Sequence, residues 1–230
     1  GGRYMTLARF LSICAAGCFA VSLAYAATST ATGLFGLAVA ADEDAAPSIY
    51  DFTMNDIDGE PVDLRDFEGS VLLVVNTASK CGNTPQYTAL EAMYQEHKED
   101  GFAVLAFPAN EFGGQEPGTD AEIKEFCTLT DYAVTFPIFS KIVVKGEGQH
   151  PLYDYLTHKL PNEKLRGEID WNFAKFLVAR DGTVLARYKA KVKPDDRKLV
   201  KQLAKALEAP RPEKADDADE NGHDDHNSGS

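Results

Sequence analysis

The chain has 230 residues, a formal net charge of −13, and 44% hydrophobic and 26% charged residues. That length can bury a sizeable core, and we expect one folded domain over residues 49–209 because both ends differ in composition from a core. The acidic balance argues against nucleic acid as a partner.

The N-terminal region has the layout of a secretory signal. In "MTLARFLSICAAGCFAVSLAYA", Arg9 precedes a long apolar run that ends in small residues. Two A-x-A cleavage sites are present, Ala24–Ala26 and Ala38–Ala40, and spacing does not choose between them. The alternative is an uncleaved anchor, since the run is long enough to span a bilayer. We therefore expect residues 1–40 to be a signal peptide or an N-terminal membrane anchor, and the protein to be exported to the periplasm or the extracellular space.

The segments that flank the predicted domain are acidic. The C-terminal "RPEKADDADENGHDDHNSGS" has seven acidic and two basic residues and no apolar residue larger than alanine. It cannot bury enough surface to order itself, so we expect residues 210–230 to be a disordered tail and residues 41–48 to be an acidic linker. His223 and His226 leave a weak metal site in the tail as an alternative. We expect no metal and no cofactor.

The first half of the domain reads as a hairpin followed by a β-α-β unit. The Asp58-Gly59 turn in "SIYDFTMNDIDGEPVDLRDF" predicts the hairpin. "SVLLVVNTA" and "GFAVLAFPA" are apolar runs typical of strands buried on both faces. Between them, "TPQYTALEAMYQEHKED" predicts a helix with Thr84 as N-cap and Pro85 at the first helical position. Residues 71–108 would then form a parallel strand pair with a right-handed crossover.

The second half predicts two further helical segments, a second hairpin and a closing helix. A helix opens at Asp120 after the glycine-rich "NEFGGQEPGT" and runs through Cys127. "FPIFSKIVV" predicts an extended segment, and "HPLYDYLTHKL" a short helix. A hairpin about Asp181-Gly182 and the amphipathic "PDDRKLVKQLAKALEA" follow. This order predicts an α/β protein of thioredoxin-like fold, with a central mixed sheet flanked by helices and an N-terminal β-hairpin.

One cysteine in "NTASKCGNT" is a candidate nucleophile. Of four cysteines, Cys14 and Cys18 lie in the predicted leader, which leaves Cys81 and Cys127. Cys81 follows a buried strand and precedes a helix, whose positive end favours a thiolate. Threonine stands where a C-x-x-C motif would have its second cysteine, so a short-range disulfide is excluded. A lone thiolate is oxidised by peroxide to a sulfenic acid. The alternative is a buried, inert cysteine.

Four separated stretches carry a resemblance to a known family. "NTASKCGNTPQYTALEAMY", "FPANEFGGQEPG", "FPIFSKI" and "WNFAKFLV" resemble the glutathione peroxidases, in order within residues 49–207, with cysteine in place of selenocysteine. The resemblance implies that Cys81 is the peroxidatic residue, helped by Gln115, Trp171 and Asn172. Their amide and indole N–H groups donate without titrating. Considered alone, Trp171 could instead be a structural aromatic residue in the core or at a strand end, and Gln115 could be a loop residue that only holds its own backbone.

The resemblance also covers the second thiol and the reductant. Cys127 resembles the resolving cysteine of thioredoxin-dependent members, which implies a disulfide with Cys81 and a helix that unwinds or swings to allow it, because bridged Cα atoms lie within about 7 Å. A buried structural cysteine is the alternative. The short "PNEKLRGEI" segment, where tetrameric glutathione-using members have an insertion, implies a monomer. With so short a segment, Cys81 would be open to bulky hydroperoxides. The protein would be reduced by a thioredoxin-like protein more readily than by glutathione.

The expected function is a thiol-dependent peroxidase that takes hydrogen peroxide and organic or lipid hydroperoxides in the response to oxidative stress. One alternative is a peroxide sensor or redox relay that passes its oxidation to a partner protein. Another is a copper-binding chaperone of related fold, which needs a C-x-x-x-C pair in the mature domain. The only such pair in the sequence, Cys14 and Cys18, lies in the predicted leader.

Overall fold

The computed structural model describes residues 47–211. The predicted leader, most of the acidic linker and nearly all of the acidic tail lie outside these residues. The helices and strands run from Ile49 to Leu207. Among them, no helix is both long enough and apolar enough to cross a bilayer.

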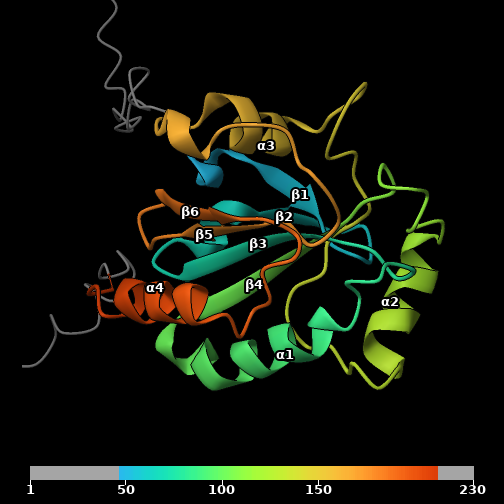
Figure 1. Cartoon of the computed structure of the whole chain (residues 1–230), viewed down its shortest axis with the longest axis horizontal. Coiled ribbons are helices and arrows are strands. Elements are labelled where there is room, and N and C mark those ends of the chain that lie inside the picture. Colours follow the sequence, from blue (N-terminus) through green and yellow to red (C-terminus); the bar gives the residue numbers. More distant parts are fainter. Residues whose placement is uncertain (1–46, 212–230) are drawn as a thin grey trace, which may run out of the picture. The chain divides into compact units, whose positions relative to one another are not determined.

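A mixed four-stranded sheet forms the centre of the domain, in the order β4-β3-β5-β6 (Figure 1). Strands β3 (Val71–Thr77) and β4 (Phe102–Pro108) are parallel, and every residue in both is buried. Strand β5 (Lys175–Val178) pairs antiparallel with β3, and β6 (Val184–Tyr188) pairs antiparallel with β5. The predicted central parallel pair, extended by a hairpin, is therefore confirmed.

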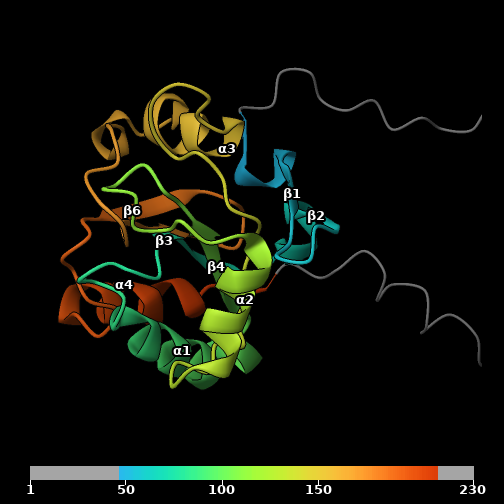
Figure 2. The same cartoon turned by 90° about the vertical axis from the view of Figure 1, so that its right-hand side faces the viewer.

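Helices cover both faces of this sheet, as its apolar strands require. Helices α1 (Gln86–His97) and α4 (Arg197–Leu207) lie on one face, and α3 (Pro151–Asp154) lies on the other (Figure 1). Helix α2 (Asp120–Leu129) packs beside one end of α1 (Figure 2). Alternate residues of β3 enter two separate apolar clusters, one on each face, as the period of a strand dictates. The thioredoxin-like α/β fold is confirmed.

The N-terminal hairpin is also confirmed, while two predicted segments differ in detail. Strands β1 (Thr53–Asn55) and β2 (Pro61–Asp63) form a separate two-stranded sheet. The predicted extended segment "FPIFSKIVV" forms only isolated bridges, because its residues Ile138 and Phe139 each pair with a single partner. The short helix α3 continues as a π-helical turn, Tyr155–Lys159. Four 3₁₀ turns complete the described elements: Ile49–Asp51, Leu64–Phe67, Lys98–Asp100 and Glu163–Leu165.

The predicted start of α1 is wrong. The helix begins at Gln86, after Pro85, and no side chain caps it. The buried Thr84 hydroxyl instead accepts a hydrogen bond from the Cys81 N–H at 3.0 Å and donates one to the Ala78 carbonyl at 2.8 Å. Those two bonds occupy the hydroxyl that a cap would have needed. Cys81 consequently lies in the turn that leads into the helix rather than at the helix start.

Candidate active site

The Cys81 turn presents the sulfur at the end of β3. Cys81 is 7% exposed, and its Sγ accepts a hydrogen bond from the Asn83 backbone N–H at 3.4 Å. The Thr84 N–H closes the turn by donating to the Cys81 carbonyl at 3.0 Å. Hydrogen bonds to an ionised acceptor are stronger than those to a neutral one, and this N–H is positioned to donate to the sulfur.

Gln115 is brought to the same place by the loop between β4 and α2. Gly113 and Gly114 both have left-handed backbone conformations, with φ of 69° and 63°. Glycine adopts these without steric cost, so the chain can double back here. The Gln115 carbonyl then accepts a hydrogen bond from the Lys80 N–H at 3.0 Å. The loop is thereby attached to the residue directly before Cys81.

Trp171 and Asn172 lie in the loop that enters β5. The buried Asn172 donates from Nδ2 to Gln115 Oε1 at 3.1 Å, and its carbonyl accepts from Asn83 Nδ2 at 3.2 Å. Asn76, near the end of β3, donates from Nδ2 to the Trp171 carbonyl at 3.2 Å. These hydrogen bonds join three segments that are far apart in the sequence. The predicted glutamine and asparagine are thus in direct contact.

A hollow of about 350 Å³ opens at the sulfur. Its lining includes Cys81, Asn83, Trp171 and two lysines, Lys189 and Lys191. The tryptophan is 40% exposed, unusual for so large an apolar side chain in this domain. The structure therefore brings all four predicted site residues together: hydrogen bonds join the glutamine and asparagine to the cysteine turn, and the tryptophan shares its hollow.

Cys127 is placed differently. It lies in α2, fully buried, and is not among the residues that line the hollow. Burial raises the pKa of the Cys127 thiol to about 11. The Tyr87 hydroxyl lies near this thiol and near Thr77, but its geometry does not meet the criteria for a hydrogen bond with either residue. Cys81 and Cys127 are both free thiols.

Two buried ionisable residues lie next to the site and were missed by the sequence analysis. Glu116 is 1% exposed and accepts hydrogen bonds from the Ser79 N–H at 2.8 Å and the Ser79 hydroxyl at 3.0 Å. Burial raises the pKa of its carboxyl group. Lys175, in β5, is fully buried. A charged residue inside the apolar run of "WNFAKFLV" was the signal that could have identified it. Across residues 47–211, no three His, Cys, Asp or Glu side chains are grouped so as to hold a metal ion.

The thioredoxin-like sheet, with a hydrogen-bonded cysteine at the end of its central strand, defines a thiol oxidoreductase. The glutathione peroxidase family model matches residues 49–157. The hydroperoxy fatty acid reductase of Synechocystis is 53% identical over 154 residues, which cover 65% of this chain and 90% of the relative. The thioredoxin/glutathione peroxidase BtuE of Escherichia coli is 45% identical over 179 residues, or 70% of this chain and 97% of the relative.

A solved structure agrees with these sequences. The crystal structure of Trgpx in its apo form superposes with a TM-score of 0.58 and 40% identity, covering 73% of this chain and all of that one. The chain belongs to the glutathione peroxidase family, in its cysteine form, and is a peroxidase.

Proposed function

We propose that Cys81 is the peroxidatic nucleophile. Its thiolate would attack the terminal oxygen of a hydroperoxide, so that an S–O bond forms as the O–O bond breaks. The sulfur is oxidised to a sulfenic acid, and the other oxygen leaves with a proton as water or an alcohol. The observation that carries this proposal is the hydrogen-bonded set of Asn83, Gln115 and Asn172 around the turn of Cys81, which lines the hollow while Cys127, the other cysteine within residues 47–211, does not.

The neighbouring amides and indole supply the donors for this step. The Asn83 N–H would stabilise the sulfur anion. The Asn172 amide donates to the side-chain oxygen of Gln115, so the Gln115 NH₂ group is not used in that hydrogen bond. That NH₂ and the Trp171 indole N–H would donate to the leaving oxygen as negative charge develops there. None of these donors titrates near neutral pH.

We further propose that Cys127 resolves the sulfenic acid. Its thiolate would attack the Cys81 sulfur, so that the S–S bond forms as the S–O bond breaks and the oxygen leaves as hydroxide, which takes up a proton from solvent to become water. A dithiol protein or glutathione would then reduce the disulfide. The burial and raised pKa of the Cys127 thiol mean that α2 has to open first. The relative named as a thioredoxin/glutathione peroxidase supports both reductants.

The test is a steady-state assay with hydrogen peroxide and a lipid hydroperoxide, in which thioredoxin and glutathione are offered side by side. Cys81→Ser should abolish turnover with every pair, and persistent peroxide consumption would refute the role of Cys81. Cys127→Ser should still form the sulfenic acid, which dimedone traps. If the peroxide-treated Cys127→Ser protein still forms an intramolecular disulfide by mass spectrometry, the resolving role is wrong.

A second function, a peroxide sensor or relay, is favoured by the same burial of Cys127. A slowly resolved sulfenic acid persists long enough to react with a thiol of another protein. Fast single-turnover oxidation combined with slow recycling by every common reductant would support the relay. Recycling by thioredoxin at the rate of oxidation would support the peroxidase cycle.

We also propose export and a monomeric state. Export rests on the apolar run within residues 1–40, and cell fractionation with N-terminal sequencing of the mature chain tests it. The monomer rests on the short segment between the π-helical turn and Trp171, and light scattering on the purified protein tests it.

A further inference from the structure

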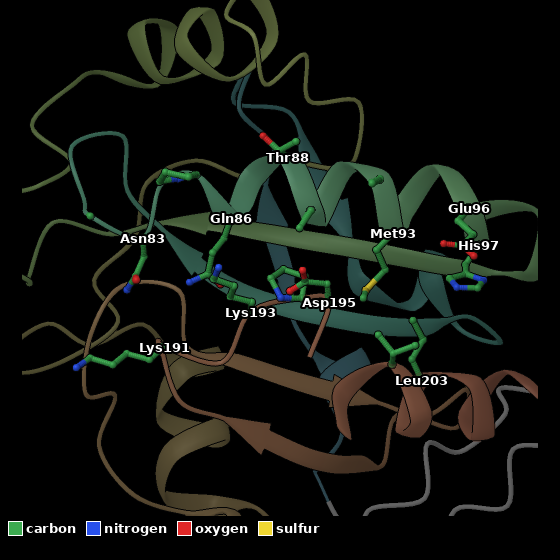
Figure 3. A pocket seen from close by; sticks show the side chains of 16 residues that line it. Asn83, Gln86, Thr88, Met93, Glu96, His97, Lys191, Lys193, Asp195 and Leu203 are labelled. Carbon is green, nitrogen blue, oxygen red and sulfur yellow. The ribbon is translucent and has the colours of Figure 1, made fainter. Parts of the chain in front are cut away.

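A groove runs along the face of the domain between α1 and the segment from the end of β6 to α4 (Figure 3). Its volume is about 900 Å³, large enough for a ligand of considerable size. The groove is lined along α1 from Gln86 to His97, the whole length of a twelve-residue helix. A helix of that length spans roughly 18 Å. The groove is therefore long as well as voluminous.

The lining of this α1–α4 groove is mainly apolar. Ala89, Ala92 and Met93 contribute from α1, and Val200 and Leu203 contribute from α4. Val200 is 41% exposed, although valine gains by burial. The methionine side chain extends from α1 toward Leu203 across the groove (Figure 3). Methionine adapts its shape readily to flexible apolar ligands.

The groove is continuous with the hollow at Cys81. Gly82, Asn83 and Lys191 line both. A molecule bound along α1 would therefore reach the proposed nucleophile without leaving the surface depression. The groove is otherwise unused by the proposed reaction, because hydrogen peroxide needs only the hollow.

Charge is distributed unevenly between the two ends. Lys189 and Lys191 line the hollow, accompanied there by Asp170. Farther along, the lining contains both Lys193 and Asp195, and the distant end carries Glu96 beside His97. An anionic group is thus favoured at the cysteine end and disfavoured at the Glu96 end. That polarity sets the direction in which an anionic amphiphile would lie.

We propose that the α1–α4 groove binds the methyl-terminal part of a free fatty acid hydroperoxide, with the hydroperoxide at Cys81 and the carboxylate on the Lys189 side. This inference rests on the proposed peroxidase function, whose substrates already include lipid hydroperoxides, and adds the place where the acyl chain of such a substrate binds. It assigns the groove a role as an acyl subsite, which hydrogen peroxide does not use.

A substitution that fills the groove tests the acyl subsite. Ala92→Trp places an indole over the apolar floor, and the matched control Ala204→Trp makes the same change on the exposed side of α4, outside the groove. With linoleic acid hydroperoxide, kcat/KM should fall about tenfold or more in Ala92→Trp, equivalent to 1.4 kcal/mol, and remain unchanged in the control. The value for hydrogen peroxide should remain unchanged in both. Equal losses with both substrates, or no loss with either, would overturn the subsite.

The orientation is tested through the ratio of kcat/KM for linoleic acid hydroperoxide to that for its methyl ester. Lys189→Glu should lower this ratio several-fold, because only the free acid is repelled. The exposed Lys201→Glu on α4, with the same change in charge, should leave it unaltered. Both substrates are measured with the same variant, so an effect of the substitution on the chemistry at Cys81 changes both kcat/KM values equally and cancels in their ratio. An unchanged ratio in Lys189→Glu would overturn the orientation.

Binding without turnover separates this proposal from the peroxidase proposal. Oleate should displace a fluorescent fatty acid from the reduced full-length protein, and Ala92→Trp should weaken that displacement while Ala204→Trp should not. If turnover fails with every hydroperoxide but oleate still binds, the peroxidase cycle is wrong and the groove assignment stands. If hydrogen peroxide is reduced but oleate does not bind, the groove assignment is overturned and the peroxidase cycle stands.

Discussion

Lys175 and Gln86 are joined by a buried hydrogen bond, in which the lysine ammonium donates to the glutamine side-chain oxygen at 2.7 Å. The same nitrogen donates to the Phe173 carbonyl at 2.7 Å and the Val192 carbonyl at 2.8 Å. Three acceptors need three N–H donors, which only the charged amine supplies. In its protonated form, the Lys175 side chain therefore holds together the start of α1, the segment after Asn172 and the loop after β6.

The pH dependence of stability should reveal this charge. Burial lowers the pKa of Lys175 from 10.5 to about 7. Between these two values the unfolded chain binds a proton that the folded chain does not, so the contribution of Lys175 to the free energy of unfolding rises with pH. The slope is at most about 1.4 kcal/mol per pH unit. Urea unfolding of the wild type and Lys175→Met from pH 7 to pH 9 should show a difference that grows in favour of the wild type. A difference independent of pH would contradict the prediction.

Thr84→Val should loosen the Cys81 turn. The substitution keeps the shape of the side chain but leaves the Ala78 carbonyl and the Cys81 N–H without their buried partner. We expect a loss of about 1–3 kcal/mol in the free energy of unfolding. The kcat/KM for hydrogen peroxide should fall as well. Thr84→Ser retains the hydroxyl and should retain most of both quantities, so similar losses in the two variants would show that the hydroxyl is not what matters.

Asn172→Asp should impair the reaction without unfolding the site. An aspartate carboxylate cannot donate to Gln115 Oε1 and places a negative charge beside the developing anion. We expect kcat/KM for hydrogen peroxide to fall about 100-fold, because Gln115 loses the hydrogen bond that orients its NH₂, one of the two donors to the leaving oxygen. The control is Asn162→Asp, where an exposed residue caps a 3₁₀ turn and aspartate caps equally well. Activity within twofold of wild type in Asn172→Asp would exclude a positioning role for this amide.

Gly182→Ala should destabilise the domain more than Gly59→Ala. Both glycines are left-handed, with φ of 83° and 88°. A Cβ at Gly182 would also lie 2.6 Å from Ser48 Oγ and 2.9 Å from Tyr50 Cε2, whereas nothing lies within 4 Å at Gly59. We expect about 1 kcal/mol of backbone strain in both and a further 1–3 kcal/mol of steric cost at Gly182. Chemical denaturation of the two variants measures the difference. Equal losses in the free energy of unfolding would mean that Ser48 and Tyr50 move aside without a measurable cost.

Weakening the cap of α2 should expose Cys127. Thr119 accepts a hydrogen bond from the Glu122 N–H and so begins this helix. Thr119→Ala should lower the local stability of α2 by about 1 kcal/mol, which raises the open population roughly fivefold. Alkylation of Cys127 by iodoacetamide, followed by mass spectrometry, should accelerate by that factor. Removal of the α4 cap by Asp196→Ala is the matched control and should not accelerate it. The same rate in both variants would show that opening of α2 does not limit access.

The elements that could be predicted from the sequence are those with a strong local pattern. The apolar runs of β3 and β4 require burial on both faces, and the Asp58-Gly59 and Asp181-Gly182 pairs suit tight turns wherever they occur. Cys81 was a candidate nucleophile from its place between a buried strand and a helix, whereas Gln115, Trp171 and Asn172 were predicted only through a family resemblance. The structure places them together, while their catalytic roles remain predictions.

The features that could not be predicted depend on side-chain hydrogen bonds that form only once the turns and the sheet are in place. Thr84 looked like a cap because capping is a local role, but its hydroxyl is used by Ala78 and Cys81. Lys175 looked out of place in a strand because two of its three acceptors, on Gln86 and Val192, come from other segments of the chain. Glu116 likewise has its partner, Ser79, on the far side of a β-α-β unit. Local propensity does not contain such information.

The position of Trp171 has an optical consequence. It is the single tryptophan of the chain, it lies at the hollow beside Cys81, and it is 40% exposed. Tryptophan emission from the unlabelled protein therefore originates entirely at the reaction centre. Each redox state of the cysteine, and each ligand that enters the hollow, changes the surroundings of that one fluorophore. The natural chain thus contains its own stopped-flow reporter.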